Sequence, residues 1–152
     1  MTKTTQSLNL QLANEVRPLI LRMGRQLRTR AMRVGSSPMD AQLLSILQAF
    51  PGIGVSDLAN IEDMSNAAMS AHIRRLLERQ LVEKVAQEEG ADRRRVSLRI
   101  TAKAQILLQD VNAERTGWLR ERLRGLSIGD LASLHEAAEV LKKLHVPELT
   151  QF

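Results

Sequence analysis

Apolar residues recur every three or four positions along most of this chain, which is the spacing of one face of an α-helix. The first such stretch runs from Leu8 to Val34 and predicts a long amphipathic helix that ends at Gly35-Ser36. Pro18 lies within it. Because proline lacks the N–H of an interior turn, the stable helix either begins just before Pro18 or bends there.

A second helix start is marked by Ser37-Pro38-Met39-Asp40, which combines a capping serine, a first-turn proline and an acid three residues after the cap. The apolar helix that follows is predicted to stop at Pro51-Gly52. After this turn, Val55 is predicted to form a short strand edge, and the residues from Ser56 to Ile61 a short supporting helix.

The last third of the chain predicts two more amphipathic helices. Thr101 can cap a helix that continues to about Arg124, and Ser127 can cap the next one. Their apolar faces have no third layer of chain to cover them. Burial against a second copy, using both chain ends, is therefore the favoured arrangement, and a bundle within one chain is the alternative.

The stretch from Ser65 to Glu78 predicts a helix with an apolar and a polar face. Ser65 can cap it, and the inward face consists of Met69, Ile73, Leu76 and Leu77. The other face has short polar side chains first and long cations after them, namely Asn66, Ser70, His72, Arg74, Arg75 and Arg79. A helix is narrow enough to enter the major groove of DNA and reach the base edges.

A charged hairpin is predicted to follow this helix. Val96, Leu98 and Ile100 alternate with Ser97 and Arg99, which is typical of a half-buried strand, and the Gly-containing segment before them predicts the hairpin tip. A run of charges alone usually forms a solvated turn. Behind a helix-turn-helix, however, arginines on a projecting tip can reach phosphates or the minor groove.

Several of these segments resemble the MarR (multiple antibiotic resistance regulator) family of winged-helix repressors. The resemblance lies in Asp92-Arg93-Arg94, in the strand end Leu98-Arg99-Ile100-Thr101 and in Val55-Ser56-Asp57-Leu58-Ala59. It implies a mainly α fold with a small antiparallel β-wing (α+β). The implied domains are an N-terminal dimerisation helix in residues 1–36, a winged helix-turn-helix in residues 37–101 and C-terminal dimerisation helices in residues 102–152.

The resemblance also implies which residues contact DNA. Early positions of the helix would make base-edge and phosphate contacts, Arg74 and Arg75 would hold phosphates, and Asp92 would brace the hairpin while Arg94 contacts DNA. The predicted DNA-binding residues are Ser65, Asn66, Ala67, Ala68, Ser70, Ala71, Arg74, Arg75, Asp92, Arg93, Arg94 and Arg95. The sequence departs from the family pattern at Gln80 and Ala104, where glycines are common.

Composition and charge agree with a helical, nucleic-acid-binding chain. Apolar residues make up 43% of the sequence but aromatic residues only 2%, so the core must be aliphatic, which favours helices. The net charge of +5 is unevenly distributed: residues 1–36 carry +6, residues 37–64 carry −4, residues 65–103 carry +4 and residues 104–152 carry −1. Cysteine is absent, which excludes disulfides, thiolate metal sites and thiol-based redox sensing.

No motif for catalysis or for a cofactor is visible. The sequence has no Gly-rich phosphate loop and no nucleophile elbow. His135 with Glu136 and Glu139, or His145 near Glu148, could be imagined as a metal or acid/base set, but such spacing on a surface helix more often means solvated side chains. We therefore expect no enzyme, no cofactor and no metal site. Without a signal-like apolar run, we expect a cytoplasmic protein with no membrane contact.

The leading hypothesis is a homodimeric, sequence-specific DNA-binding transcriptional regulator that binds a palindromic operator on double-stranded DNA. Following the family resemblance, it would be a repressor relieved by a small aromatic or amphipathic ligand. One alternative is a nonspecific, architectural winged-helix protein whose affinity comes from phosphates alone. Another is a winged-helix module that binds proteins instead of DNA.

Overall fold

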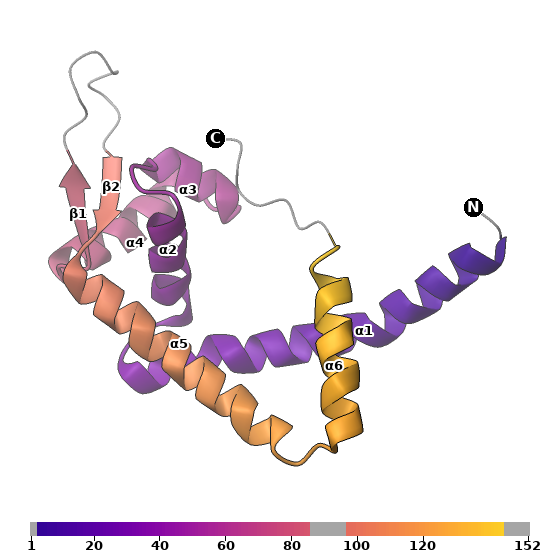
Figure 1. The fold of residues 1–152 in the computed structure, drawn as a ribbon. Coiled ribbons are helices and arrows are strands. Elements are labelled where there is room, and N and C mark those ends of the chain that lie inside the picture. Colours follow the sequence, from indigo (N-terminus) through magenta and orange to yellow (C-terminus); the bar gives the residue numbers. More distant parts are fainter. Residues whose placement is uncertain (1–2, 86–96, 145–152) are drawn as a thin grey trace.

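The computed structural model describes residues 3–85 and 97–144, and these are mainly helical with one small antiparallel sheet, as predicted (Figure 1). The elements follow one another as α1 (Lys3–Thr29), the 3-10 helix η1 (Arg30–Val34), α2 (Pro38–Ala49), α3 (Val55–Ile61), α4 (Asn66–Glu78), β1 (Val82–Val85), β2 (Ser97–Ile100), α5 (Ala102–Leu123) and α6 (Ile128–Leu141). The elements from α2 to β2 form a winged helix-turn-helix.

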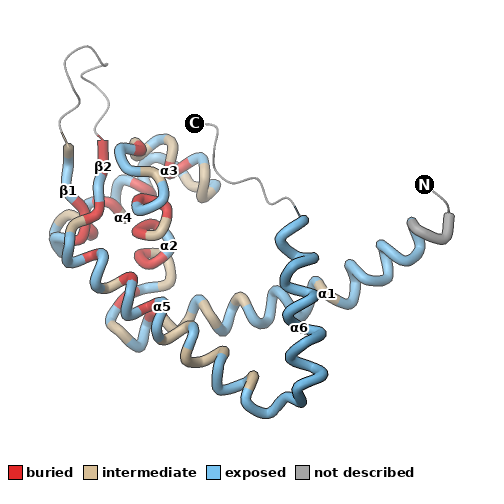
Figure 2. The backbone as a smooth tube through the Cα atoms, in the orientation of Figure 1, coloured by how far each residue is buried: buried red, intermediate tan, exposed pale blue. Residues whose placement is uncertain are grey.

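The hydrophobic core lies inside this winged helix-turn-helix. Figure 2 shows the buried residues gathered on α2, α3, α4, the two strands and the start of α5, whereas α6 and most of α1 are exposed. The largest fully buried side chains are aliphatic, as the composition predicts, and include Leu43, Leu44, Leu47, Leu58, Met69, Leu76, Leu81, Leu98 and Leu108. Burial of each side chain contributes about 1.5–3 kcal/mol to the stability of the fold, so this cluster holds α4 in a fixed position against α2, α3 and the sheet.

A second, smaller hydrophobic cluster packs η1 and α5 against α2 of the winged helix-turn-helix. Ala31 of η1, Ala41 of α2 and Val111 of α5 are all fully buried and pack together, with Val34 beside them. The η1 segment ends at Gly35, whose φ of +75° belongs to the left-handed region that glycine adopts readily. The short turn from η1 to α2, called the η1–α2 corner below, is therefore held in place by packing among η1, α2 and α5.

The sheet is antiparallel and pairs Val82 with Ile100 and Lys84 with Leu98. The predicted strand edge at Val55 was wrong, because Val55 is the first residue of α3. The backbone contacts to β2 come from just before it: the Gly52 N–H donates to the Leu98 carbonyl at 2.9 Å, and the Leu98 N–H donates to the Ile53 carbonyl at 3.3 Å. Gly54 then caps α3 with extended backbone, which ends the strand-like segment before Val55.

The predicted alternation in β2 is confirmed in part. Leu98 and Ile100 are buried and Arg99 is exposed, but Ser97 is buried as well, with 7% of its surface accessible. Val96 lies outside the described residues.

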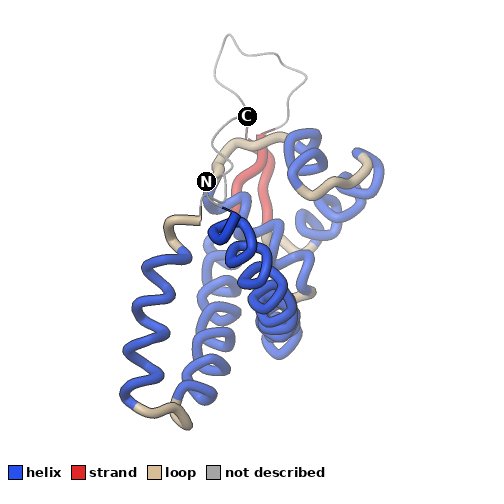
Figure 3. The backbone as a smooth tube through the Cα atoms, turned by 90° about the vertical axis from the view of Figure 1, so that its right-hand side faces the viewer, coloured by secondary structure: helices blue, strands red, loops and turns tan. Residues whose placement is uncertain are grey.

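The long helices extend away from the winged helix-turn-helix. α1 continues through Pro18 without a break in its assignment, so the predicted alternative in which the helix begins near Pro18 was wrong. α5 begins after the cap Thr101, and α6 after the cap Ser127. Figure 3 shows the strands at one end of the molecule and the turn between α5 and α6 at the other. Among the described helices, none is long and apolar enough to cross a membrane.

Candidate nucleic-acid interface

The helix α4 is fixed at its start by a cap and along its inner face by the core. Ser65 has extended backbone, and its Oγ accepts a hydrogen bond from the Ala68 N–H at 3.2 Å, which confirms it as the N-cap. Met69, Ile73 and Leu76 are buried at helical spacing. Its inner face is thereby anchored, and its opposite face points to solvent.

The residues predicted to touch base edges lie on the exposed side of the first turns of α4. Ser65, Asn66, Ala67, Ser70 and Ala71 are all exposed. Ala68 is half-buried. This surface offers one amide, two hydroxyls and small methyl groups, and such groups can follow the floor of a major groove without steric obstruction.

Two arginines follow one turn later on the same helix. Arg74 and Arg75 are both exposed, and within the described residues neither pairs with Glu78. The Arg75 guanidinium contacts Nδ1 of His72, a half-buried side chain one turn earlier. His72 therefore contacts a neighbour on its own helix.

A groove of about 230 Å³ runs between α4 and the sheet. Ile73, Leu77 and Leu98 supply its apolar lining, and Arg74 and Lys84 supply two cations at its edge. Lys84 is exposed on β1, at the base of the hairpin. Sequence reasoning missed Lys84, although a basic residue on the first strand of a predicted wing was a usable signal.

The tip of the predicted wing lies outside the described residues. β1 ends at Val85 and β2 begins at Ser97, so Asp92, Arg93, Arg94 and Arg95 fall between them without a described structure. The described base of the hairpin lies beside α4 (Figure 1). β1 follows α4 in the chain and contacts it. The four predicted tip residues stay predictions.

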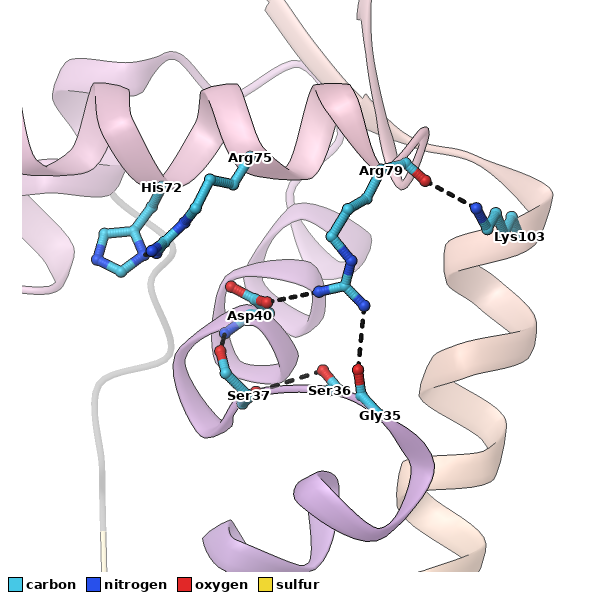
Figure 4. A network of polar contacts seen from close by, with 8 residues as sticks. All are labelled: Gly35, Ser36, Ser37, Asp40, His72, Arg75, Arg79 and Lys103. Atoms are coloured by element: carbon cyan, nitrogen blue, oxygen red, sulfur yellow. Dashed lines mark hydrogen bonds and ion pairs between the residues drawn. The ribbon is translucent and has the colours of Figure 1, made fainter.

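Arg79 occupies a different position from the other cations of α4. It was grouped with the polar face of the helix, yet its Nη1 donates to Asp40 Oδ2 at 2.8 Å and its Nη2 to the Gly35 carbonyl at 3.1 Å (Figure 4). Arg79 thus turns toward the corner between η1 and α2. Its pairing partner is separated from it by 39 residues, so no local sequence pattern could identify the pair.

Acidic side chains near α4 would repel a phosphate backbone if they faced it. Glu62, which follows α3, accepts a hydrogen bond from the Gln42 amide on α2 at 3.3 Å, so it is directed toward the body of the module. Asp63 is exposed in the turn before α4. Among the described residues, no group of three or more histidine, aspartate or glutamate side chains is arranged to hold a metal ion.

Residues 37–96 of the chain match the model of the MarR family. Among proteins of curated function, none matches this sequence. Solved structures match over nearly the whole chain. A multiple antibiotic-resistance repressor (MarR) from Listeria monocytogenes is 18% identical, covers 95% of this chain and 96% of its own, and superposes with a TM-score of 0.71.

Two further structures agree. A putative transcriptional regulator from Pseudomonas aeruginosa is 22% identical, with coverage of 91% of this chain and 95% of its own and a TM-score of 0.76. A MepR F27L mutant of S. aureus, solved bound to an oligodeoxyribonucleotide, is 15% identical, with coverage of 88% and 98% and a TM-score of 0.65. Residues 37–96 of this chain thus match the MarR family model, and the chain shares its fold with these solved structures along nearly its whole length.

Proposed function

We propose that this chain is a homodimeric, sequence-specific DNA-binding transcriptional regulator in which α4 is the recognition helix. The observation that carries the proposal is the exposed face of α4, where Asn66 and Ser70 stand clear of the core and Arg74 follows one turn later. Amides and hydroxyls can discriminate base edges, whereas arginines at the flank hold phosphates and fix the register. The oligonucleotide-bound MepR supports the same use of this fold.

The wing contributes a second contact in this proposal. Arg94 at the tip grips the flank of the duplex, with Arg93 and Arg95 beside it and Asp92 as a brace. Arg74 and Lys84 border the groove between α4 and the sheet, so a backbone phosphate that follows this groove meets two cations. The DNA-binding surface would thus extend from the start of α4 to the hairpin.

A two-fold dimer is the arrangement that best covers the apolar surface of the chain ends. The helix α6 has no buried residue in the single chain, and large apolar side chains are exposed on both α1 and α6, among them Leu12, Leu19, Ile20, Leu131, Leu134 and Leu141. Water contact with so many aliphatic side chains is costly, and a second copy removes it. The dimer would present two recognition helices to a palindromic operator.

A groove on the helical body fits a small effector. It has a volume of about 420 Å³. Its lining includes Trp118, two carboxylates (Glu114 and Glu121) and an excess of four arginines, which are Arg30, Arg33, Arg120 and Arg122. Two guanidinium groups lie near the Trp118 ring, with the Arg122 carbon 3.8 Å and the Arg30 carbon 5.6 Å from the ring centroid. Its Nε1 is buried and has no hydrogen-bond partner among the described residues.

This set of groups suits an aromatic carboxylate, since arginines can pair with its carboxylate while its ring packs beside the indole edge and the guanidinium groups near it. We propose that such a ligand binds here and relieves repression. It would favour a dimer geometry in which the distance between the two recognition helices no longer matches the two half-sites of the operator. Trp118 is the only tryptophan, so saturable quenching of its fluorescence by benzoate, with weaker operator binding in parallel, is the expected result. Quenching without any change in operator affinity would refute the effector role.

The experiment that tests the proposed function is selection of bound duplexes from a random pool by the full-length chain. We expect a palindromic consensus, because a two-fold dimer reads two inverted half-sites. A consensus without symmetry would contradict the dimer on DNA. Recovery of unselected sequences would instead favour phosphate-only binding by an architectural protein.

A further inference from the structure

The recognition helix is tied to the rest of the protein at its C-terminal end. Arg79, the C-cap of α4, donates from Nη1 to Asp40 Oδ2 at 2.8 Å and from Nη2 to the Gly35 carbonyl at 3.1 Å (Figure 4). Asp40 lies in the first turn of α2, and Gly35 ends η1. One guanidinium group therefore connects the recognition helix to both sides of the corner between η1 and α2.

The start of α5 holds the same end of α4 from another direction. Lys103 Nζ donates to the Arg79 carbonyl at 2.8 Å, and Thr101 Oγ1 donates to the Gln80 carbonyl at 2.8 Å. Carbonyls at the end of a helix have no partner within the helix, so these bonds satisfy groups that would otherwise need water. Each of these hydrogen bonds from another part of the chain reaches α4 at its C-terminal end.

The anchor to which Arg79 binds is itself packed. Ala31, Ala41 and Val111 are fully buried around the η1–α2 corner. The side chain of Asp40 is 10% exposed, and its Oδ1 is buried without a hydrogen-bond partner among the described residues. A carboxylate in this situation depends strongly on its remaining partner, because removing that partner leaves a largely buried charge unpaired.

The Asp40 carboxylate has a different hydrogen-bond partner from that of Asp130, the acid at the same position of α6. Both helices begin with a capping serine followed by an aspartate three residues later. In α6, the Asp130 carboxylate accepts from the backbone N–H of its own cap Ser127 and completes a capping box. In α2, Ser37 accepts from the Asp40 N–H, but the Asp40 carboxylate accepts from Arg79, which is 39 residues away. The acid of α2 thus serves a long-range contact instead of its own helix.

We propose that Arg79 and Asp40 form a positioning pair, which sets the angle of the recognition helix on the protein body while neither side chain contacts DNA. This inference rests on the proposed function. The 13 residues of α4 span about 20 Å at 1.5 Å per residue, so a tilt of about 10° at the anchored end moves Asn66 by roughly 3 Å. Such a displacement breaks hydrogen bonds to base edges, which tolerate only a few tenths of an ångström.

The sign of one substitution separates positioning from simple electrostatics. Asp40→Asn removes a negative charge from a DNA-binding module, and charge alone would therefore raise its affinity for phosphates. It would also free Arg79 to bind a phosphate. Positioning predicts the reverse, a loss of affinity, because the amide no longer holds the guanidinium group in place.

The test measures binding of the full-length chain to its selected duplex and to a scrambled duplex over a series of salt concentrations. The variants are Asp40→Asn, Arg79→Gln, the double variant and Arg79→Lys, which keeps the charge but loses the planar fork. The matched control is Glu78→Gln, which removes an exposed negative charge from the neighbouring position on α4. Thermal unfolding of each variant fixes a temperature at which all are folded.

We expect Asp40→Asn and Arg79→Gln each to weaken operator binding about tenfold, the effect of losing one base-edge contact, without a change in salt slope. The double variant should be no worse than either single one, Arg79→Lys should be intermediate, and Glu78→Gln should bind at least as tightly as the wild type. Specificity over the scrambled duplex should fall in parallel, which a loss of fold stability alone would not produce.

Three results would overturn the positioning pair. The first is Asp40→Asn binding as tightly as Glu78→Gln. The second is Arg79→Gln lowering the salt slope by about one, as the loss of a phosphate contact does. The third is both variants melting earlier while the affinity of the folded protein is unchanged. A wild-type chain without preference for any duplex would refute the proposed function itself. Specific binding by the wild type with undisturbed variants would refute only the pair.

Discussion

Replacing Gln80 by glycine should stabilise the protein. Gln80 follows α4 with a φ of +59°, in the left-handed region that residues other than glycine rarely adopt. Its N–H donates to the Leu77 carbonyl at 2.9 Å, and the Leu81 N–H donates to the Leu76 carbonyl at 2.9 Å. These two bonds form a Schellman motif, whose left-handed position is usually occupied by glycine.

The expected gain follows from two opposing terms. A left-handed conformation costs an L-residue about 1–2 kcal/mol, which glycine does not incur. Glycine also gives the unfolded chain more freedom, and this offsets about 0.4–1 kcal/mol of the gain. Gln80 is exposed, and its backbone carbonyl, which accepts from Thr101, is unchanged by the substitution. The net expectation for Gln80→Gly is a stabilisation of about 0.5–1 kcal/mol.

Urea unfolding followed by circular dichroism measures this difference. All variants are compared at one protein concentration, because the proposed dimer would unfold in a concentration-dependent way. The midpoint should rise while the m-value stays constant. Gln80→Ala is the matched control, since it removes the side chain but keeps the strain, and it should unfold close to the wild type. If Gln80→Gly were neutral or destabilising at constant m-value, the assignment of strain to Gln80 would be refuted.

Three further outcomes follow from the described contacts. Arg74→Ala should weaken binding to all duplexes alike and lower the salt slope by about one, whereas Ser70→Ala should change sequence preference in a selection experiment; equal effects on every duplex would contradict the role of Ser70. Leu134→Glu, on the exposed face of α6, should dissociate the dimer in sedimentation without loss of helix content, and an unchanged sedimentation coefficient would contradict the proposed interface. Hydrogen bonds from the side chain and the backbone of Ser127 lower the pKa of Asp130 below its usual value of 3.8. The ionised carboxylate therefore stabilises α6 fully at pH values above 3.8, and this stabilisation is lost as pH falls through the lowered pKa. Asp130→Asn should therefore melt below the wild type at neutral pH, and a difference that persisted unchanged in strong acid would contradict this origin.

Local chemistry explains the parts of the fold that were predictable from sequence. Ser37, Ser65, Thr101 and Ser127 were each predicted as helix caps, and each accepts a hydrogen bond from a backbone N–H within the first turn of its helix. Capping depends on neighbouring residues only, so the sequence contains all the information that it requires. The exposed face of α4 was likewise predictable from its spacing of apolar residues.

Tertiary contacts explain what was not predictable. Val55 has a strand-forming side chain, but the backbone of Gly52 and Ile53 meets β2 first, and Val55 is left to begin α3. Ser97 is polar, yet it is buried beside the hairpin base. Arg79 was predicted to share the polar face of α4, but its side chain pairs with Asp40. For Val55 and Arg79 the deciding neighbour is distant in sequence, so local patterns carry no signal for it.

The residues predicted to contact DNA could be placed in the fold to different extents for the same reason. Periodicity located the helix residues from Ser65 to Arg75, because a helix face depends on spacing alone. It did not locate Lys84, whose position beside Arg74 depends on how the sheet packs against α4. The tip residues from Asp92 to Arg95 lie outside the described residues, and their contact with DNA stays a prediction.

The most direct test of the central claim is a comparison of affinity and stoichiometry on a palindromic duplex selected by the protein and on its scrambled version, at about 0.15 M salt. If two recognition helices read the duplex, two chains should bind each palindrome, with an affinity at least about 10³-fold tighter than for the scrambled sequence. Equal affinity for the two duplexes, or a single chain bound per palindrome, would contradict the account.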